Sequence, residues 1–184
     1  MTDQTPSIEV VEQESEEPHV VVGIDGSAGA RAALLFALHD AARRGVPVEA
    51  VGAYHPPDYW LDFYAMGISG PDQARAAAVD QVRDFVAAVL PDGPQPAPPV
   101  KVRVRRGSAA DALVHASQHA ALLVVGSRGH GGFTSMLLGS VSMQCVVHAV
   151  CPVTVVHSPE ARRERLHLRR ARHAGAAAGG LPLA

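Results

Sequence analysis

The sequence is poor in lysine and cysteine, and each shortage excludes a class of protein. Its 184 residues include a single lysine, Lys101, which follows a valine, so the Gly-Lys-Ser/Thr sequence of a phosphate-binding P-loop cannot occur. Two cysteines, Cys145 and Cys151, are too few for a disulfide scaffold. They fit a reducing compartment, so we expect a cytoplasmic protein.

Long apolar runs are also missing. None approaches the roughly 18 residues of a membrane-spanning helix, and the acidic N-terminal segment has no apolar stretch typical of a signal peptide. Aromatic residues make up 4% of the chain, whereas hydrophobic residues as a whole make up 47%. This composition is typical of a globular protein without contact to a membrane.

The net charge is only −2, but the charges are unevenly distributed. Residues 1–18 carry six acidic residues and no basic one, residues 19–157 carry ten of each sign, and residues 158–184 carry six arginines against two glutamates. We interpret 19–157 as one domain, 1–18 as an acidic disordered tail and 158–184 as an Arg/Ala/Gly-rich disordered tail. The neutral domain is not expected to bind nucleic acid. The basic tail could bind nucleic acid, an acidic partner or the acidic tail, but a solvated tail is the default expectation.

Within 19–157, segments with strand periodicity alternate with segments of helix periodicity. The apolar patterns predict strands and helices in strict alternation, with strands at 19–24, 46–54, 100–105, 121–126 and 153–156, and helices at 30–44, 73–90, 108–119 and 140–149. Strands joined through helices return parallel to one another by right-handed crossovers. The order therefore predicts an α/β fold with a single open, five-stranded parallel sheet and helices on both faces.

A glycine-rich segment, residues 126–142, follows the most apolar of these strands. Glycine lets backbone N–H groups approach a phosphate, and the first turn of a helix offers unpaired N–H groups and a positive dipole end. Ser140 and Ser142 add hydroxyl donors and Arg128 adds a positive charge. Because open α/β sheets bind ligands at the carboxyl ends of their strands, the segment indicates an anion site. A glycine-rich turn with Ser140 as an ordinary helix N-cap is the alternative.

The spacing of these residues resembles the universal stress protein family. Four positions match the Gly-x2-Gly-x9-Gly-Ser/Thr motif of its ATP-binding members: Gly126, Gly129, Gly139 and Ser140. Residues 22–27 are similar to the family's first strand and turn, and residues 149–156 to its ending. The resemblance covers 19–157 and implies a Rossmann-like fold, similar to that of adenine nucleotide alpha hydrolases, with strand order 3-2-1-4-5.

The resemblance also implies a site for ATP. Asp25 would lie near the ribose or the adenine, the small side chain of Ala53 would leave room for the adenine, and Val125 would line the ribose together with Gly126. The phosphates would be held by residues of the glycine-rich segment, with Arg128 as a further candidate: Gly129, Gly139, Ser140, Val141 and Ser142. Mg²⁺ or Mn²⁺ would bridge phosphate oxygens, and no metal site made by the protein alone is expected.

A homodimer is a further implication of the resemblance. It would form through the last strand, Val153–Val156, which is apolar and lies at an edge of the expected sheet. An unpaired apolar edge strand is an aggregation hazard, so pairing with a second copy would also be favourable on physical grounds.

Several residues keep alternative roles. Asp25 could bond the backbone of its own turn, and Arg128 could be a solvated surface charge. His130 could act as a general acid or base, but no partner carboxylate lies near it in the sequence. His115 and His119 have a zinc-like spacing without a third ligand nearby, so we expect two ordinary histidines.

We therefore predict an ATP-binding protein that acts in nucleotide-linked stress sensing or regulation and is not an enzyme. Hydrolysis needs a positioned water, a base and charge stabilisation, and no recognisable motif anchors Asp25 or His130 for these roles. No catalytic residue is assigned. The alternatives are a slow ATP-hydrolysing enzyme of the same fold, a protein that binds AMP or cyclic AMP, and an adaptor that binds no nucleotide.

Overall fold

The structure is a computed structural model that describes residues 7–13, 15–55, 71–129 and 138–158. Its strands and helices alternate as the sequence predicts, and a short 3-10 helix, η2 (Leu90–Asp92), follows α2. The elements are, in chain order, β1 (Ile8–Val10), β2 (Val20–Gly23), α1 (Ala28–Arg44), β3 (Val48–Tyr54), α2 (Pro71–Val89), β4 (Val100–Arg106), α3 (Ala109–Ala116), β5 (Leu122–Gly126), α4 (Ser140–His148) and β6 (Val153–Val156).

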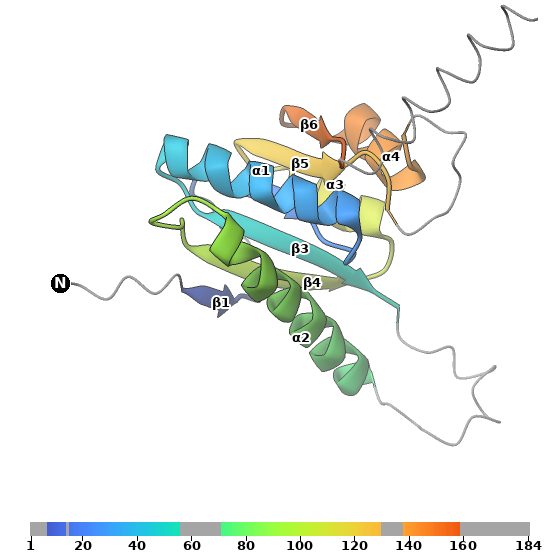
Figure 1. The fold of residues 1–184 in the computed structure, drawn as a ribbon. Helices are drawn as coiled ribbons and strands as arrows, with labels where there is room; N and C mark the ends of the chain where they lie inside the picture. Colours follow the sequence, from blue (N-terminus) through green and yellow to red (C-terminus); the bar gives the residue numbers. More distant parts are fainter. Residues whose placement is uncertain (1–6, 14, 56–70, 130–137, 159–184) are drawn as a thin grey trace, which may run out of the picture.

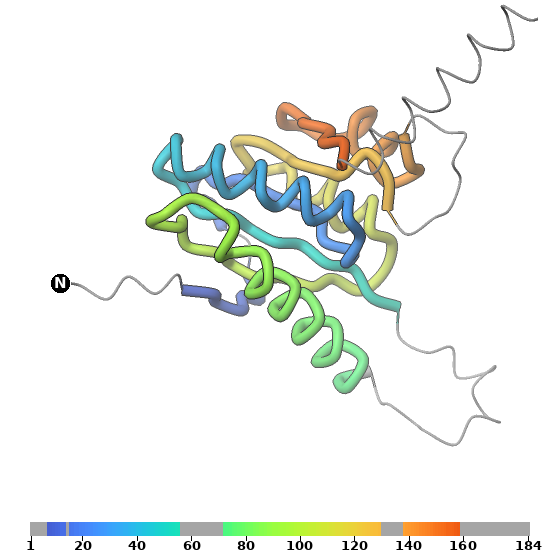
Figure 2. The backbone as a smooth tube through the Cα atoms, in the orientation of Figure 1, coloured from blue at the N-terminus to red at the C-terminus, as the bar shows by residue number. Residues whose placement is uncertain are grey.

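The strands form one parallel sheet in the order β1-β4-β3-β2-β5-β6 (Figure 1). The five predicted strands are present and follow the predicted order, but the prediction of five strands is wrong because the sheet has six. The additional strand, β1, comes from the segment that we expected to be a disordered tail. The backbone of β1 runs beside that of β4 at the edge of the sheet (Figure 2). Ile8 lies opposite Val100 and also packs against the hydrophobic core, which explains why so short a segment joins the sheet.

Helices cover both faces of the sheet. On one face, α1 and α2 pack apolar side chains such as Leu34 and Val86 against Val20 and Val22 of β2. On the other face, α3 and α4 pack against the intervening residue, Val21, and its neighbours in β3 and β5. Figure 1 shows α1 and α2 on the near side of the sheet. Because side chains alternate along a strand, a run of apolar residues serves both cores at once.

Local signals in the sequence account for the helix ends. Ser27 precedes α1, and its Oγ accepts a hydrogen bond of 3.1 Å from the backbone N–H of Ala30. Ser108 caps α3 in the same way through the N–H of Asp111, at 3.3 Å. Gly45 follows α1 in the left-handed conformation, with φ of 69°, which confirms its predicted role as the residue that ends the helix.

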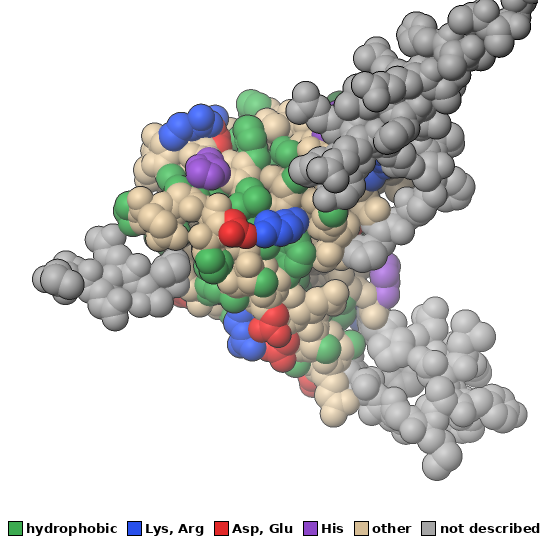
Figure 3. Space-filling model, in the orientation of Figure 1, with side chains coloured by type: hydrophobic (Ala, Val, Ile, Leu, Met, Phe, Trp, Pro, Cys, Tyr) green, Lys and Arg blue, Asp and Glu red, His purple; other side chains and the backbone are tan. Residues whose placement is uncertain are grey.

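Acidic and basic side chains are interspersed over the face formed by α1 and α2 (Figure 3). Arg31 of α1 pairs with Asp92 of η2, and Arg83 of α2 pairs with Asp80 at 2.8 Å. Because opposite charges lie next to each other in these pairs, they do not add up to a large electrostatic potential of one sign. Among the described helices, none has the length and hydropathy needed to cross a membrane.

Candidate functional site

A cavity of about 400 Å³ opens at the carboxyl ends of β2, β3 and β5. The strands contribute their last residues, and the first turns of α3 and α4 close the sides. This is the place where an open parallel sheet binds ligands, because neighbouring crossovers leave a crevice between the loops. The volume lies within the range of small-molecule sites.

One end of the cavity is formed by the N-terminus of α4. The N-cap residue is Gly139, which has no side chain to cap the helix, and Ser140 is the first helical residue. The alternative in which Ser140 caps the helix is therefore wrong. In contrast, Ser27 and Ser108 cap α1 and α3 with their hydroxyls. The N–H groups in the first turn of α4 have no side-chain acceptor from the cap, and they carry the positive end of the helix dipole.

Ser142 has a different role from the predicted one. Its side chain is 4% exposed, and its Oγ donates a hydrogen bond of 2.6 Å to the backbone carbonyl of Gly126. A serine hydroxyl has a single hydrogen, so while this bond is made, Ser142 cannot donate to a phosphate as we expected. The bond instead ties α4 to the end of β5. The N–H of Gly139 donates to the carbonyl of Ser127 at 2.8 Å, which fastens the two ends of the glycine-rich segment together.

Close backbone contacts explain two of the motif glycines. A Cβ on Gly126 would lie 2.7 Å from the carbonyl carbon of Gly29, so the start of α1 can approach the end of β5 this closely only because Gly126 lacks a side chain. A Cβ on Gly129 would lie 2.2 Å from Oδ2 of Asp25. The glycines thus bring α1, the turn after β2 and the glycine-rich segment together at one point.

Asp25 lies at the mouth of the cavity, after the end of β2, and its side chain is exposed. Oδ1 accepts a hydrogen bond of 3.0 Å from the N–H of Ser27, which confirms the alternative that Asp25 bonds the backbone of its own turn. Oδ2 faces Gly129. Asp25 and Arg128 are the charged side chains among the described residues of the lining. The cavity therefore offers an anion mainly backbone N–H groups rather than a basic patch.

The other end of the cavity is apolar. Val51 and half-buried Ala53 of β3 line it on the same face of the sheet as Val125 of β5, and Ala112 and Leu113 of α3 also line it. The sequence did not single out the residues of α3, because alanine and leucine on an amphipathic helix are indistinguishable from ordinary core residues. Their position directly after β4 was the available signal, since loops and helix starts that follow parallel strands meet at this edge.

All of the predicted site residues line this one cavity, and their contact with a ligand stays a prediction. The lining includes Asp25, Ala53, Val125, Gly126, Arg128, Gly129, Gly139, Ser140, Val141 and Ser142. His130 lies outside the described residues. His115 and His119 are not among the lining residues, and the described part of the chain contains no group of three or more His, Cys, Asp or Glu that could hold a metal ion.

Comparison with known proteins gives the same family for sequence and fold. The model of the universal stress protein family matches residues 18–157. A universal stress protein of Mycolicibacterium smegmatis is 38% identical over 139 residues, covering 74% of this chain and 45% of the relative. One of Mycobacterium tuberculosis is 39% identical over 148 residues, covering 77% and 48%. The chain thus spans about half the length of these curated relatives.

Solved structures show the same architecture. A universal stress protein in complex with cAMP has a TM-score of 0.55 and 25% identity, covering 78% of this chain and 99% of that one. The universal stress protein UspA from Lactobacillus plantarum has a TM-score of 0.57 and 24% identity, with the same coverage.

Proposed function

This chain belongs to the universal stress protein family, and from that premise we propose that its cavity binds ATP and that the protein acts in nucleotide-linked stress regulation. The observation that carries the proposal is the N-terminus of α4, which meets the cavity without a side-chain cap. A phosphate there would accept hydrogen bonds from backbone N–H groups and would be stabilised by the helix dipole. The apolar end, at Ala53 and Leu113, suits an adenine ring.

Each part of the ligand has a partner in this arrangement. The ribose would lie between Asp25 and Val125, and the phosphates would extend toward Gly129, Gly139 and Ser140. Mg²⁺ or Mn²⁺ would be held by the phosphate oxygens and water, since Asp25 is the one carboxylate among the described lining residues. Binding of AMP or cyclic AMP is the alternative. The structurally similar universal stress protein in complex with cAMP supports this alternative.

Two measurements decide among these ligands. Mass spectrometry of nucleotide released from the purified protein is expected to find ATP, and calorimetry is expected to show tighter binding of ATP with Mg²⁺ than of AMP or cyclic AMP. Tighter binding of cyclic AMP would establish the alternative ligand. If no nucleotide co-purifies and calorimetry detects no ATP binding with Mg²⁺, the proposal fails and the adaptor alternative gains support.

The variant Gly139→Ala tests whether the phosphates bind at the N-terminus of α4. A Cβ at this position has no neighbour closer than 3.7 Å, so the methyl group fits the protein itself. We expect the thermal midpoint of the variant to stay close to that of the wild type while ATP binds at least about tenfold more weakly, which corresponds to about 1.4 kcal/mol. Unchanged affinity for ATP in Gly139→Ala and also in Gly139→Val would place the phosphates elsewhere.

We propose that the protein is not an enzyme and at most hydrolyses ATP slowly. Asp25, the one carboxylate among the described lining residues, is exposed and accepts a hydrogen bond from the N–H of Ser27, a structural role in its own turn that accounts for this residue without catalysis. Phosphate release should therefore be far below one turnover per second. Turnover near that rate, lost in Asp25→Ala, would establish the enzymatic alternative.

We also propose a homodimer that forms through β6 in the cytoplasm. Four large apolar side chains are exposed on α4 and the turn before β6, at 48% to 70% of their surface: Met143, Val146, Val147 and Val150. Apolar patches of this kind mark contact surfaces. Sedimentation should give a dimer for the wild type and for the control Val10→Glu, and a monomer for Val147→Glu. A monomeric wild type would refute the dimer.

A further inference from the structure

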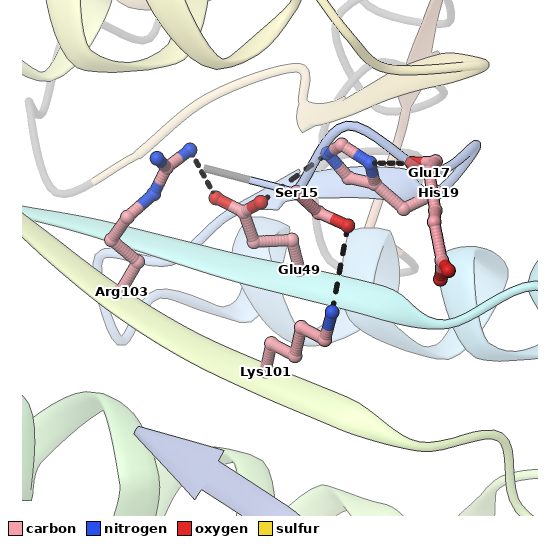
Figure 4. Close-up of polar contacts among 6 residues, drawn as sticks. All are labelled: Ser15, Glu17, His19, Glu49, Lys101 and Arg103. Carbon is pink, nitrogen blue, oxygen red and sulfur yellow. Dashed lines mark hydrogen bonds and ion pairs between the residues drawn. The ribbon is translucent and has the colours of Figure 1, made fainter. Parts of the chain in front are cut away.

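The described residues between β1 and β2, 11–13 and 15–18, cross the sheet and form what we call the N-terminal strap. Because β1 lies beyond β4 and runs parallel to β2, the strap must pass over β4 and β3 to reach the start of β2. Nζ of Lys101 in β4 donates to Oγ of Ser15 in the strap, at 3.4 Å (Figure 4). Lys101 alternates with Val100 and Val102, which face α1 and α2, so the strap lies on the opposite face.

Three ionisable side chains are buried at this face, and none of them is among the residues that line the cavity. His19 is 2% exposed, Glu49 of β3 is 1% exposed, and Arg103 of β4 is 4% exposed. The carboxylate of Glu49 lies between the other two: one oxygen pairs with the guanidinium of Arg103, and Oε2 lies 3.2 Å from Nε2 of His19 (Figure 4). Buried charges of this kind persist only when they are paired.

The ring of His19 joins the strap to the sheet. Nδ1 lies 2.7 Å from the backbone carbonyl oxygen of Glu17 in the strap, whereas Nε2 faces the carboxylate of Glu49 in the sheet. A carbonyl and a carboxylate are acceptors only, so both ring nitrogens need a proton to satisfy them. A neutral imidazole carries one such proton, and the imidazolium carries two. The geometry therefore selects the charged form of His19.

We propose that His19 is a proton-dependent latch that holds the N-terminal strap, and with it β1, on the sheet. In the protonated state, the ring bridges Glu17 and Glu49. Loss of its proton removes one of the two contacts and leaves a buried acceptor without a donor, so the strap detaches more readily. Attachment of β1 to β4 thereby depends on proton concentration.

The charged groups around His19 determine the direction of the pH dependence. Burial lowers the pKa of His19, and the positive charge of Arg103 lowers it further. The hydrogen bonds to Glu49 and to the carbonyl of Glu17, together with the negative charge of Glu49, raise it by more. The net effect is a pKa above 6.5. A raised pKa means that the latch is fully closed below about pH 6.5, and that its contribution is lost as the pH rises through the pKa of the folded state. The latch opens on the alkaline side.

The size of the pH effect on strap detachment follows from the difference between the pKa of His19 in the attached and detached states. If detachment of the strap exposes His19 to water, its pKa there returns to about 6.5. The equilibrium constant for detachment then does not change with pH below pH 6.5. It rises by up to about tenfold per pH unit between pH 6.5 and the pKa of His19 in the folded state, and above that pKa it no longer changes. The backbone N–H groups of Val11 and Val100 report the detachment, because they donate to Val102 and Ser7 across the β1–β4 pair.

The test combines two measurements on the full chain. NMR of the histidine side chains is expected to show the ring of His19 protonated at both nitrogens, with a pKa above 6.5. Hydrogen exchange between pH 6 and pH 9, expressed as protection relative to the intrinsic rate, should show protection of Val11 and Val100 falling around that same pKa. A His19 pKa at or below 6.5, or protection that stays constant over this range, would overturn the proposal.

Two variants separate His19 from the other histidines. His19→Gln cannot titrate, so the protection of Val11 and Val100 should no longer depend on pH. His39→Gln removes an exposed histidine of α1 and should keep the wild-type profile. A pH profile that survives in His19→Gln refutes the latch. If His19→Gln does not fold, the coincidence of the two midpoints in the wild type still decides.

Discussion

The contact between Asp25 and Gly129 can be tested by adding one methyl group. The Cβ of Gly129→Ala would lie 2.2 Å from Oδ2 of Asp25, whereas ordinary contacts begin at 3.4 Å, so one of the two must move by more than 1 Å. The exposed carboxylate can rotate away, but this breaks its hydrogen bond to the N–H of Ser27. Since such a bond contributes about 0.5–1.5 kcal/mol, we expect the free energy of unfolding to fall by about 1 kcal/mol.

A second substitution tells whether Asp25 is the cause. Asp25→Ala by itself also loses the bond to Ser27 and should cost about 1 kcal/mol. In the double variant the obstacle is gone and the bond is already absent, so the cost should again be about 1 kcal/mol rather than 2 kcal/mol. Urea denaturation of the wild type, both single variants and the double variant gives this coupling energy directly.

Gly126→Ala provides the contrast. Its methyl group would meet backbone atoms of Gly29, at 2.7–3.0 Å, and no side chain can rotate to make room. Overpacking of this kind costs about 1–3 kcal/mol, and Asp25→Ala should not reduce it. If the effects of Gly129→Ala and Asp25→Ala are additive, or if Gly129→Ala is as stable as the wild type, the contact inferred between these residues is wrong.

Three further predictions concern buried groups. Ser142→Ala leaves the last carbonyl of β5 without its donor and should cost about 1–3 kcal/mol in urea denaturation, whereas Ser140→Ala, at an exposed position, should cost less than about 0.5 kcal/mol. Glu49→Gln removes the carboxylate between two buried cations and should cost about 3–5 kcal/mol, measured in the same way; a cost below 1 kcal/mol would contradict its burial as an ion. Burial raises the pKa of Cys145 to about 11, so a thiol reagent at pH 7.5 should modify the partly exposed Cys151 first, as peptide mass spectrometry can show; faster labelling of Cys145 would contradict this order.

The sequence was sufficient for the parts of the fold that depend on local periodicity. Apolar runs flanked by turns predicted five of the six strands, and helices between them predicted a parallel sheet. The order of these strands came from the family resemblance and not from the apolar pattern. It was not sufficient for β1, since the three residues Ile8–Val10 lie in an acidic segment and form a strand only against the edge of β4.

The same distinction applies to the sites. The glycine spacing predicted one end of the cavity, because backbone approach requires residues without a Cβ. The bond of Ser142 to a carbonyl could not be predicted, since a serine at a helix start is equally suited to a ligand. Arg103 alternates with Val102 and Val104, a pattern typical of a strand with one solvent-facing side, and Glu49 is a charged residue in an otherwise apolar segment. In the folded chain both side chains are buried, and Glu49 pairs with Arg103 and His19, residues that are far from it in the sequence.

The position of β1 also limits how copies of this domain can join. Without β1, the sheet would end on one side in β4, seven residues long, and on the other in β6. A molecule with two such edges could add copies at both and grow into a chain. β1 covers part of β4 with a strand of three residues that carries the exposed Glu9, a poor template for a further strand. If copies pair through β6 as proposed, β1 at the opposite edge would stop the addition of further copies, and the association would close at two.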